Sequence, residues 1–85
     1  MDNEEFLIAE TWFDTPLSPF EASRLIRRLD DSLRQHGARS LGTHFAPDGT
    51  WRITRCIGSA RAIRQAHYAA GLKLDRVSAV LIQAA

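Results

Sequence analysis

Residues 59–77 read S-A-R-A-I-R-Q-A-H-Y-A-A-G-L-K-L-D-R-V, and the rest of the chain can be arranged around this stretch. Ser59 is a typical N-cap residue, apolar residues follow it at helical spacing, and Gly71 is typical of a helix end. A short loop then leads to a last strand. The histidine of this helix, His67, falls on the flank of the apolar stripe, where we expect a structural or orienting role rather than catalysis.

Upstream of this stretch the chain carries equally clear start and stop signals. Ser18 and Glu21 have the spacing of a capping box before a helix that reaches Gly37. Asp48-Gly49, between two strand-like runs, is a strong hairpin signal. The expected elements are a strand at 5–13, a helix at 18–37, strands at 38–46 and 50–58, a helix at 59–71 and a strand at 75–83.

The order β-α-β-β-α-β predicts an α+β, ferredoxin-like sandwich. In this fold two helices cover one face of a four-stranded antiparallel sheet, with strand order 4-1-3-2. The chain has 85 residues, which is enough for a single domain over residues 1–85.

One sheet face of such a domain is left without helices. The first and last strands nevertheless carry apolar residues on both faces, and an uncovered apolar sheet favours aggregation. We therefore expect a homodimer through the sheet face. The alternative is that Trp12 or Trp51 folds over its own sheet.

Composition excludes several classes of function. Eleven basic and ten acidic residues give a net charge of +1, and the strand at 50–58 lacks the paired aromatic residues of RNA-binding sheets, so no nucleic-acid partner is expected. No apolar run reaches the length of a membrane helix, so no membrane partner is expected. An acidic N-terminus and a single cysteine favour a soluble, cytoplasmic protein.

Three polar residues are candidates for chemistry. By strand alternation, Glu10, His44 and Cys56 are expected on the face without helices, and carboxylate, imidazole and thiol together suit a divalent transition metal. Each also has a plainer interpretation. Glu10 can form a salt bridge with Arg52 or Arg55, His44 can be a half-exposed strand residue, and Cys56 can be a small buried apolar residue.

Two other kinds of function stay open. A dimer cleft near Glu10, His44 and Cys56 would suit a small ligand or an enzymatic reaction, although no glycine-rich elbow accompanies the cysteine as in nucleophilic enzymes. A protein-interaction module without chemistry is the third candidate.

Several segments resemble a small ferredoxin-like family of unknown function whose best-understood relatives bind nickel. The matching segments are F-L-I-A-E-T-W-F, H-G-A-R-S-L, D-G-T, A-I-R-Q-A-H-Y-A-A-G-L and D-R-V. The resemblance implies a dimeric α/β sandwich and nickel binding, and Glu10 and His67 match positions typical of the family. The chain departs from the family at Ile57-Gly58-Ser59-Ala60, where an acidic, proline-containing segment is usual. The metal-ligand candidates are therefore Glu10, His44, Cys56 and His67.

Overall fold

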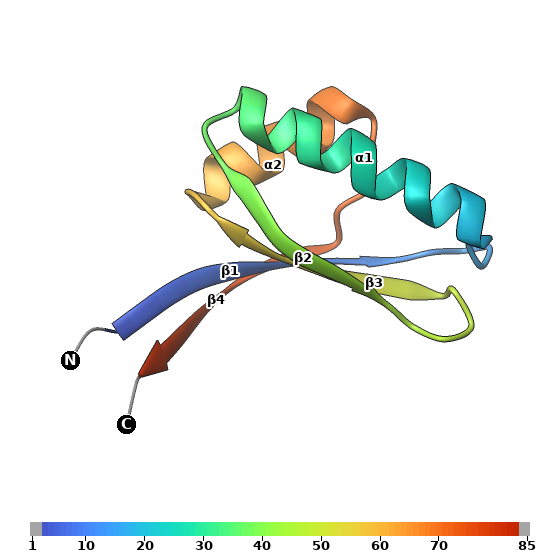
Figure 1. The fold of residues 1–85 in the computed structure, drawn as a ribbon, viewed down its shortest axis with the longest axis horizontal. Coiled ribbons are helices and arrows are strands. Elements are labelled where there is room, and N and C mark those ends of the chain that lie inside the picture. The colour runs from blue at the N-terminus through green and yellow to red at the C-terminus, as the bar shows by residue number, and fades with distance from the viewer. Residues whose placement is uncertain (1–2, 84–85) are drawn as a thin grey trace.

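The computed structural model describes the backbone of residues 3–83 and the side chains of residues 6–79. All six elements occur in the predicted order, and their ends lie within two residues of the predicted ones. They are β1 (Asn3–Trp12), α1 (Pro19–Gln35), β2 (Arg39–Phe45), β3 (Trp51–Ile57), α2 (Ala60–Ala70) and β4 (Arg76–Gln83), shown in Figure 1.

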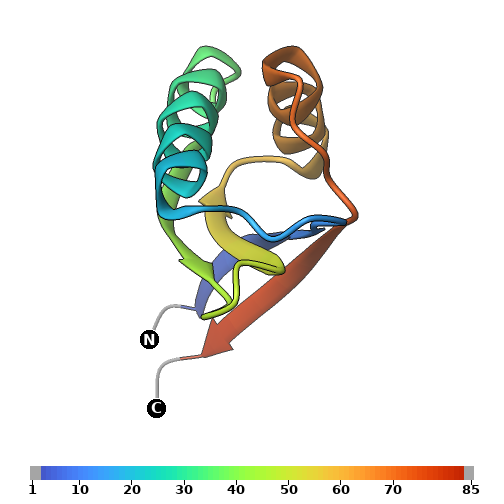
Figure 2. The same ribbon diagram turned by 90° about the vertical axis from the view of Figure 1, so that its right-hand side faces the viewer.

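The four strands form one antiparallel sheet in the order β2-β3-β1-β4, which is the predicted order read from the opposite edge. Both helices lie over the same face of this sheet (Figure 2). The other face carries no helix, and we call it the open face. The ferredoxin-like prediction is confirmed.

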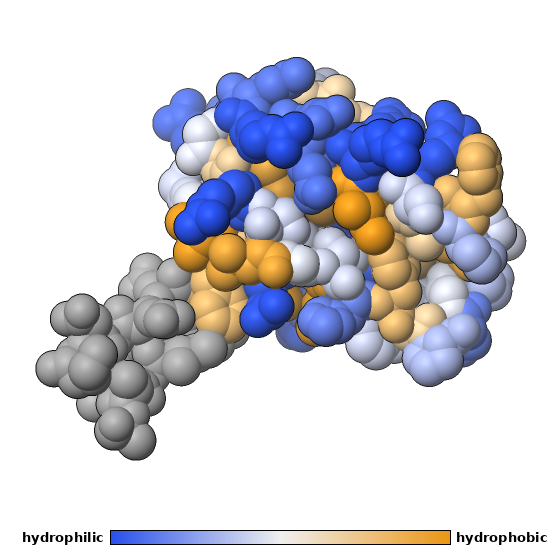
Figure 3. Space-filling model, in the orientation of Figure 1, coloured by the Kyte–Doolittle hydropathy of each residue, from blue (hydrophilic) through white to orange (hydrophobic). Residues whose placement is uncertain are grey.

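The hydrophobic core lies between the helices and the sheet. Leucines of α1 and apolar residues of α2 meet the helix-facing side chains of β1 and β3 there. The buried members are Ala9, Leu25, Leu29, Leu33, Ala38, Cys56, Ile63 and Ala66. Hydrophilic side chains gather on the outer surface over the helices, as Figure 3 shows for one side of the molecule.

Local signals in the sequence fix the helix ends. The Ser18 hydroxyl accepts from the Glu21 amide at 3.2 Å, and the Glu21 carboxylate accepts from the Ser18 amide at 2.9 Å, which completes the capping box. At α2 the Ser59 hydroxyl accepts from the Ala62 amide at 3.0 Å, without a reciprocal bond. Gly71 ends α2 in the left-handed conformation, with φ of 69°.

Strand β2 contains one irregularity that matters for the site. The register with β3 shifts between Ser40 and Gly42, which marks a β-bulge. Beyond the bulge His44 lies opposite Ile53. This register places His44 on the open face.

Candidate functional site

The open face carries aromatic and aliphatic side chains at its centre. Alternation places Ile8 and Trp12 of β1, and Trp51 and Ile53 of β3, on this face. Trp12 lies directly opposite Trp51, and their ring centroids are 6.0 Å apart. The tryptophans therefore contact each other, yet Trp12 stays 55% exposed. They do not cover the face.

Glu10 and His44 lie on the open face, as predicted. Both are registered with Ile53, from the two strands that flank β3, so the backbones of the two residues are about 10 Å apart. The Glu10 carboxylate accepts from Arg76 Nε at 2.6 Å, on the neighbouring strand β4. The predicted pairing of Glu10 with Arg52 or Arg55 is wrong, because the partner comes from β4.

Cys56 is on the opposite face from the predicted one. It lies opposite Leu7 in the register, is fully buried, and belongs to the core beneath the helices. Burial raises the pKa of its thiol to about 11. The thiolate that a metal or a nucleophilic reaction needs is therefore disfavoured at Cys56.

The orientation of β3 explains this error. Trp51, Ile53 and Ile57 form the more apolar set of the strand, so hydropathy alone points them toward the helices. The structure turns them to the open face instead and buries the other set, which includes Arg52. An apolar open face and a polar residue in the core are two results of this one orientation.

His67 is also buried on the helix-covered face, where it contacts Arg52. Its Nε2 accepts a hydrogen bond from Arg52 Nη2 at 2.7 Å, and its Nδ1 lies 2.7 Å from the carbonyl oxygen of Ile63. The carbonyl can only accept, so the proton is on Nδ1. Burial, with a smaller contribution from the Arg52 charge, lowers the pKa of His67 to about 4. His67 is a neutral structural side chain that binds a buried arginine.

Arg52 is the residue that sequence reasoning missed. Its side chain is completely buried, and its guanidinium donates to the hydroxyls of Thr54 at 2.7 Å and Thr11 at 2.9 Å in addition to His67. Burial lowers the pKa of Arg52 to about 10. In the described part of the chain its Nε has no hydrogen-bond partner. The available signal was Thr11, a hydroxyl residue at a helix-facing position opposite Arg52.

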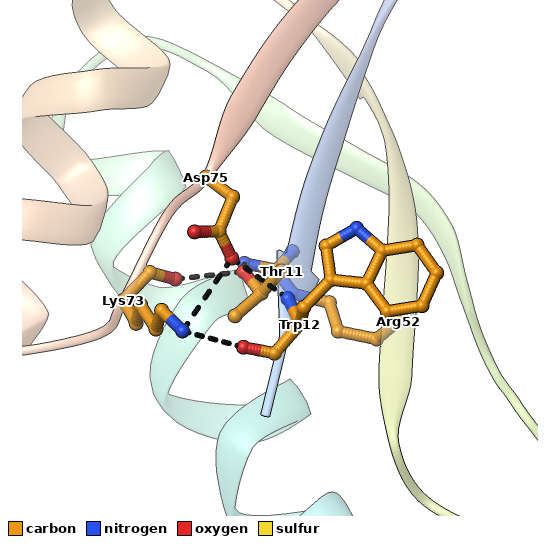
Figure 4. Close-up of polar contacts among 5 residues, drawn as sticks. All are labelled: Thr11, Trp12, Arg52, Lys73 and Asp75. Carbon is orange, nitrogen blue, oxygen red and sulfur yellow. Dashed lines mark hydrogen bonds and ion pairs between the residues drawn. The ribbon is translucent and has the colours of Figure 1, made fainter. Parts of the chain in front are cut away.

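We call Arg52 and its three partners, Thr11, Thr54 and His67, the Arg52 cluster. Through Thr11 this cluster connects to a set of contacts between β1 and the segment before β4 (Figure 4). The Thr11 hydroxyl donates to the carbonyl of Lys73 at 2.7 Å, and the Asp75 carboxylate accepts from the Trp12 amide at 2.7 Å. Lys73 Nζ donates a hydrogen bond to the Trp12 carbonyl at 2.7 Å. These contacts fix the end of β1 and thereby the position of Trp12 at the open face.

The four predicted metal ligands are thus split between the two faces of the sheet. Glu10 and His44 lie on the open face, whereas Cys56 and His67 are buried on the other. Among the described residues no group of three or more histidine, cysteine, aspartate or glutamate side chains is placed to hold a metal ion. Within one chain, the predicted set does not fit a nickel centre.

None of the helices in the described region has the length and hydropathy needed to cross a membrane.

Comparison with protein-family models and with curated proteins finds no match for this chain.

Proposed function

We propose that the protein is a homodimeric small-ligand-binding protein in which the open sheet faces of two copies meet and enclose the ligand. One observation carries this proposal: the open face keeps aromatic and aliphatic side chains in contact with water. Trp12 is 55% and Ile57 37% exposed, and Trp51 and Ile53 between them are half-buried. Covering such a face removes apolar area from water, and this burial stabilises the dimer by about 25 cal/mol for each Å².

Polar groups on the same face support a ligand rather than a purely apolar interface. Glu10 and Arg76 form an ion pair next to the apolar centre, and His44 lies on the far side of Ile53. When a second sheet covers these groups they lose their water, and a buried charge needs a polar partner. A small molecule with its own polar groups supplies such partners. A cytoplasmic location belongs to the same proposal, as a prediction from the sequence.

The mass in solution tests the dimer. Light scattering is expected to give twice the 9.5 kDa of one chain for the unaltered protein. Trp12→Glu places a carboxylate on the open face and is expected to reduce the mass to that of a monomer. Tyr68→Glu is the matched control, because Tyr68 lies on α2 and is 89% exposed.

Two results would overturn the proposal. One is a monomer at every concentration up to the millimolar range. The other is a dimer that Trp12→Glu leaves intact while Tyr68→Glu dissociates it, which would move the interface to the helices. A hetero-complex on the open face of a monomeric chain would instead favour the protein-interaction module.

A further inference from the structure

A hollow of about 270 Å³ lies on the helix side of the molecule, away from the open face. It is bounded by the N-terminal half of α1, the loop after β1 and the segment that follows α2. Its lining residues are Phe13, Leu17, Glu21, Arg24, Leu25, Arg28, Gly71, Leu72 and Lys73. Nothing in the proposed dimer uses this hollow.

The floor of the hollow is apolar. Leu25 is buried in the core, and Phe13, Leu17 and Leu72 pack against that core while staying partly accessible. The four side chains come from three separate segments of the chain. They offer an apolar surface that an aliphatic or aromatic group can contact without any rearrangement of the core.

The rim of the hollow is charged, but most of its charges already have partners. Arg28 donates to the carbonyl of Ala70, and Lys73 donates to a backbone carbonyl and lies 3.8 Å from Asp75. Glu21 is held by the helix cap, and the hydrogen bond from the Ser18 backbone is the main cause that keeps its pKa below the ordinary value. Because these groups already have partners within the protein, they are less available to bind a ligand.

Arg24 differs from Arg28 and Lys73 because its guanidinium donates no hydrogen bond among the described residues, although its charge helps to lower the pKa of Glu21. It is exposed, and its guanidinium carbon lies 5.8 Å from the centre of the Phe20 ring. A contact with a ring face leaves the N–H groups at the edge of the guanidinium plane free to donate. Such a planar set of donors matches a carboxylate in two parallel hydrogen bonds.

We propose that this hollow binds a small amphipathic monocarboxylate, whose apolar part lies on the Phe13, Leu17 and Leu72 surface and whose carboxylate pairs with Arg24. Arg24, Arg28 and Lys73 outnumber Glu21 and the Lys73 partner Asp75 by one charge, so a single carboxylate would balance the charge of the site. At about 30 Å³ for each water-sized group, the volume accommodates on the order of ten non-hydrogen atoms. A ligand of this size is expected to bind with a dissociation constant of about 1 mM.

Octanoate, which has ten non-hydrogen atoms, is a suitable probe, and octanamide is its neutral counterpart of the same shape. Titration followed by amide chemical shifts in NMR is expected to give saturable shifts at Leu25, Gly71 and Leu72 with octanoate. Octanamide is expected to give shifts at the same amides only at concentrations about fivefold higher, because it lacks the charge. The open-face amides of Ile8 and Ile53 serve as internal controls and are expected not to move.

Two variants test the role of Arg24. Arg24→Gln is expected to weaken octanoate about fivefold and to leave octanamide unchanged. Arg27→Gln makes the same change of charge at an exposed position of α1 outside the hollow, and it is expected to leave both affinities within twofold.

Three results would overturn the inference: equal affinity for octanoate and octanamide, equal effects of the two variants, or shifts confined to the open face. The outcome is independent of the dimer, because light scattering on the same samples reports the oligomeric state separately.

Discussion

At the scale of single residues, the most informative side chain is Arg52. Among the described residues no carboxylate contacts this buried cation, and its cost is reduced because two threonine hydroxyls and His67 accept from the two Nη groups, although Nε has no partner. This arrangement requires His67 to stay neutral, because a protonated imidazole has no lone pair to offer Arg52. His67 thus has a structural explanation in this chain.

This dependence predicts a loss of stability in mild acid. The pKa of His67 is about 4 in the folded protein and 6.5 as the ordinary value. The contribution of neutral His67 to the free energy of unfolding is fully present above pH 6.5. It is lost as the pH falls from 6.5 to 4, because only the unfolded chain binds the proton in that range. The full loss is about 3 kcal/mol. Urea unfolding at several pH values measures it.

His67→Gln is the matched variant for the pH experiment. Its free energy of unfolding is expected to vary less between pH 6.5 and 4 than that of the unaltered protein, whatever its absolute value. Carboxylates titrate in both proteins, so the difference between the two curves isolates the histidine. Parallel curves over this range would show that His67 does not titrate as described.

At the scale of elements, the hairpin between β2 and β3 is tied to the loop before α1. The Leu17 amide donates to the Gly49 carbonyl at 2.9 Å, and Gly49 has φ of 75°. A Cβ added at Gly49 would lie 2.5 Å from the carbonyl oxygen of Leu17. The turn glycine is required both by its backbone conformation and by the close approach of another segment.

Two glycine substitutions separate these requirements. Gly37 has nearly the same φ, 76°, but an added Cβ would meet nothing within 4 Å. Gly37→Ala is therefore expected to cost about 1 kcal/mol from backbone strain alone. Gly49→Ala is expected to cost about 3 kcal/mol, because the contact with Leu17 must also shift.

Thermal unfolding measures this difference, which corresponds to a melting temperature lower by about 10 °C for Gly49→Ala than for Gly37→Ala. Equal melting temperatures of the two variants would mean that the loop before α1 moves away at little cost. In that case the tie between Leu17 and Gly49 does not stabilise the hairpin.

At the scale of the whole molecule, the arrangement of the sheet decides which metal site can exist. Among the side chains that the structure describes, one chain offers Glu10 and His44 on the open face, which are too few ligands for a stable centre and are separated by Ile53. Two open faces that meet would bring two carboxylates and two imidazoles to one interface. Nickel binding thus stays a prediction, and it now requires the dimer.

Calorimetric titration with Ni²⁺ tests this version of the metal site. We expect binding to the dimer that His44→Gln abolishes, that Trp12→Glu abolishes by separating the copies, and that His67→Gln leaves unchanged because that side chain is buried elsewhere. No heat with the confirmed dimer would exclude the metal, and a loss only in His67→Gln would contradict the placement of the ligands.

The sequence by itself determined the order of the elements, their ends and the fold. The signals for these features are local: the caps at Ser18 and Ser59, the Asp48-Gly49 turn and the helical spacing of the leucines. Each depends only on hydrogen bonds and steric contacts between residues that are close in the sequence. The tertiary structure alone decided which side of β3 faces the helices. A strand's period of two divides its side chains into two sets but does not say which set is buried, and here the more polar set is. That choice placed Cys56 and Arg52 in the interior and left Trp51 at the open face, opposite Trp12 of β1.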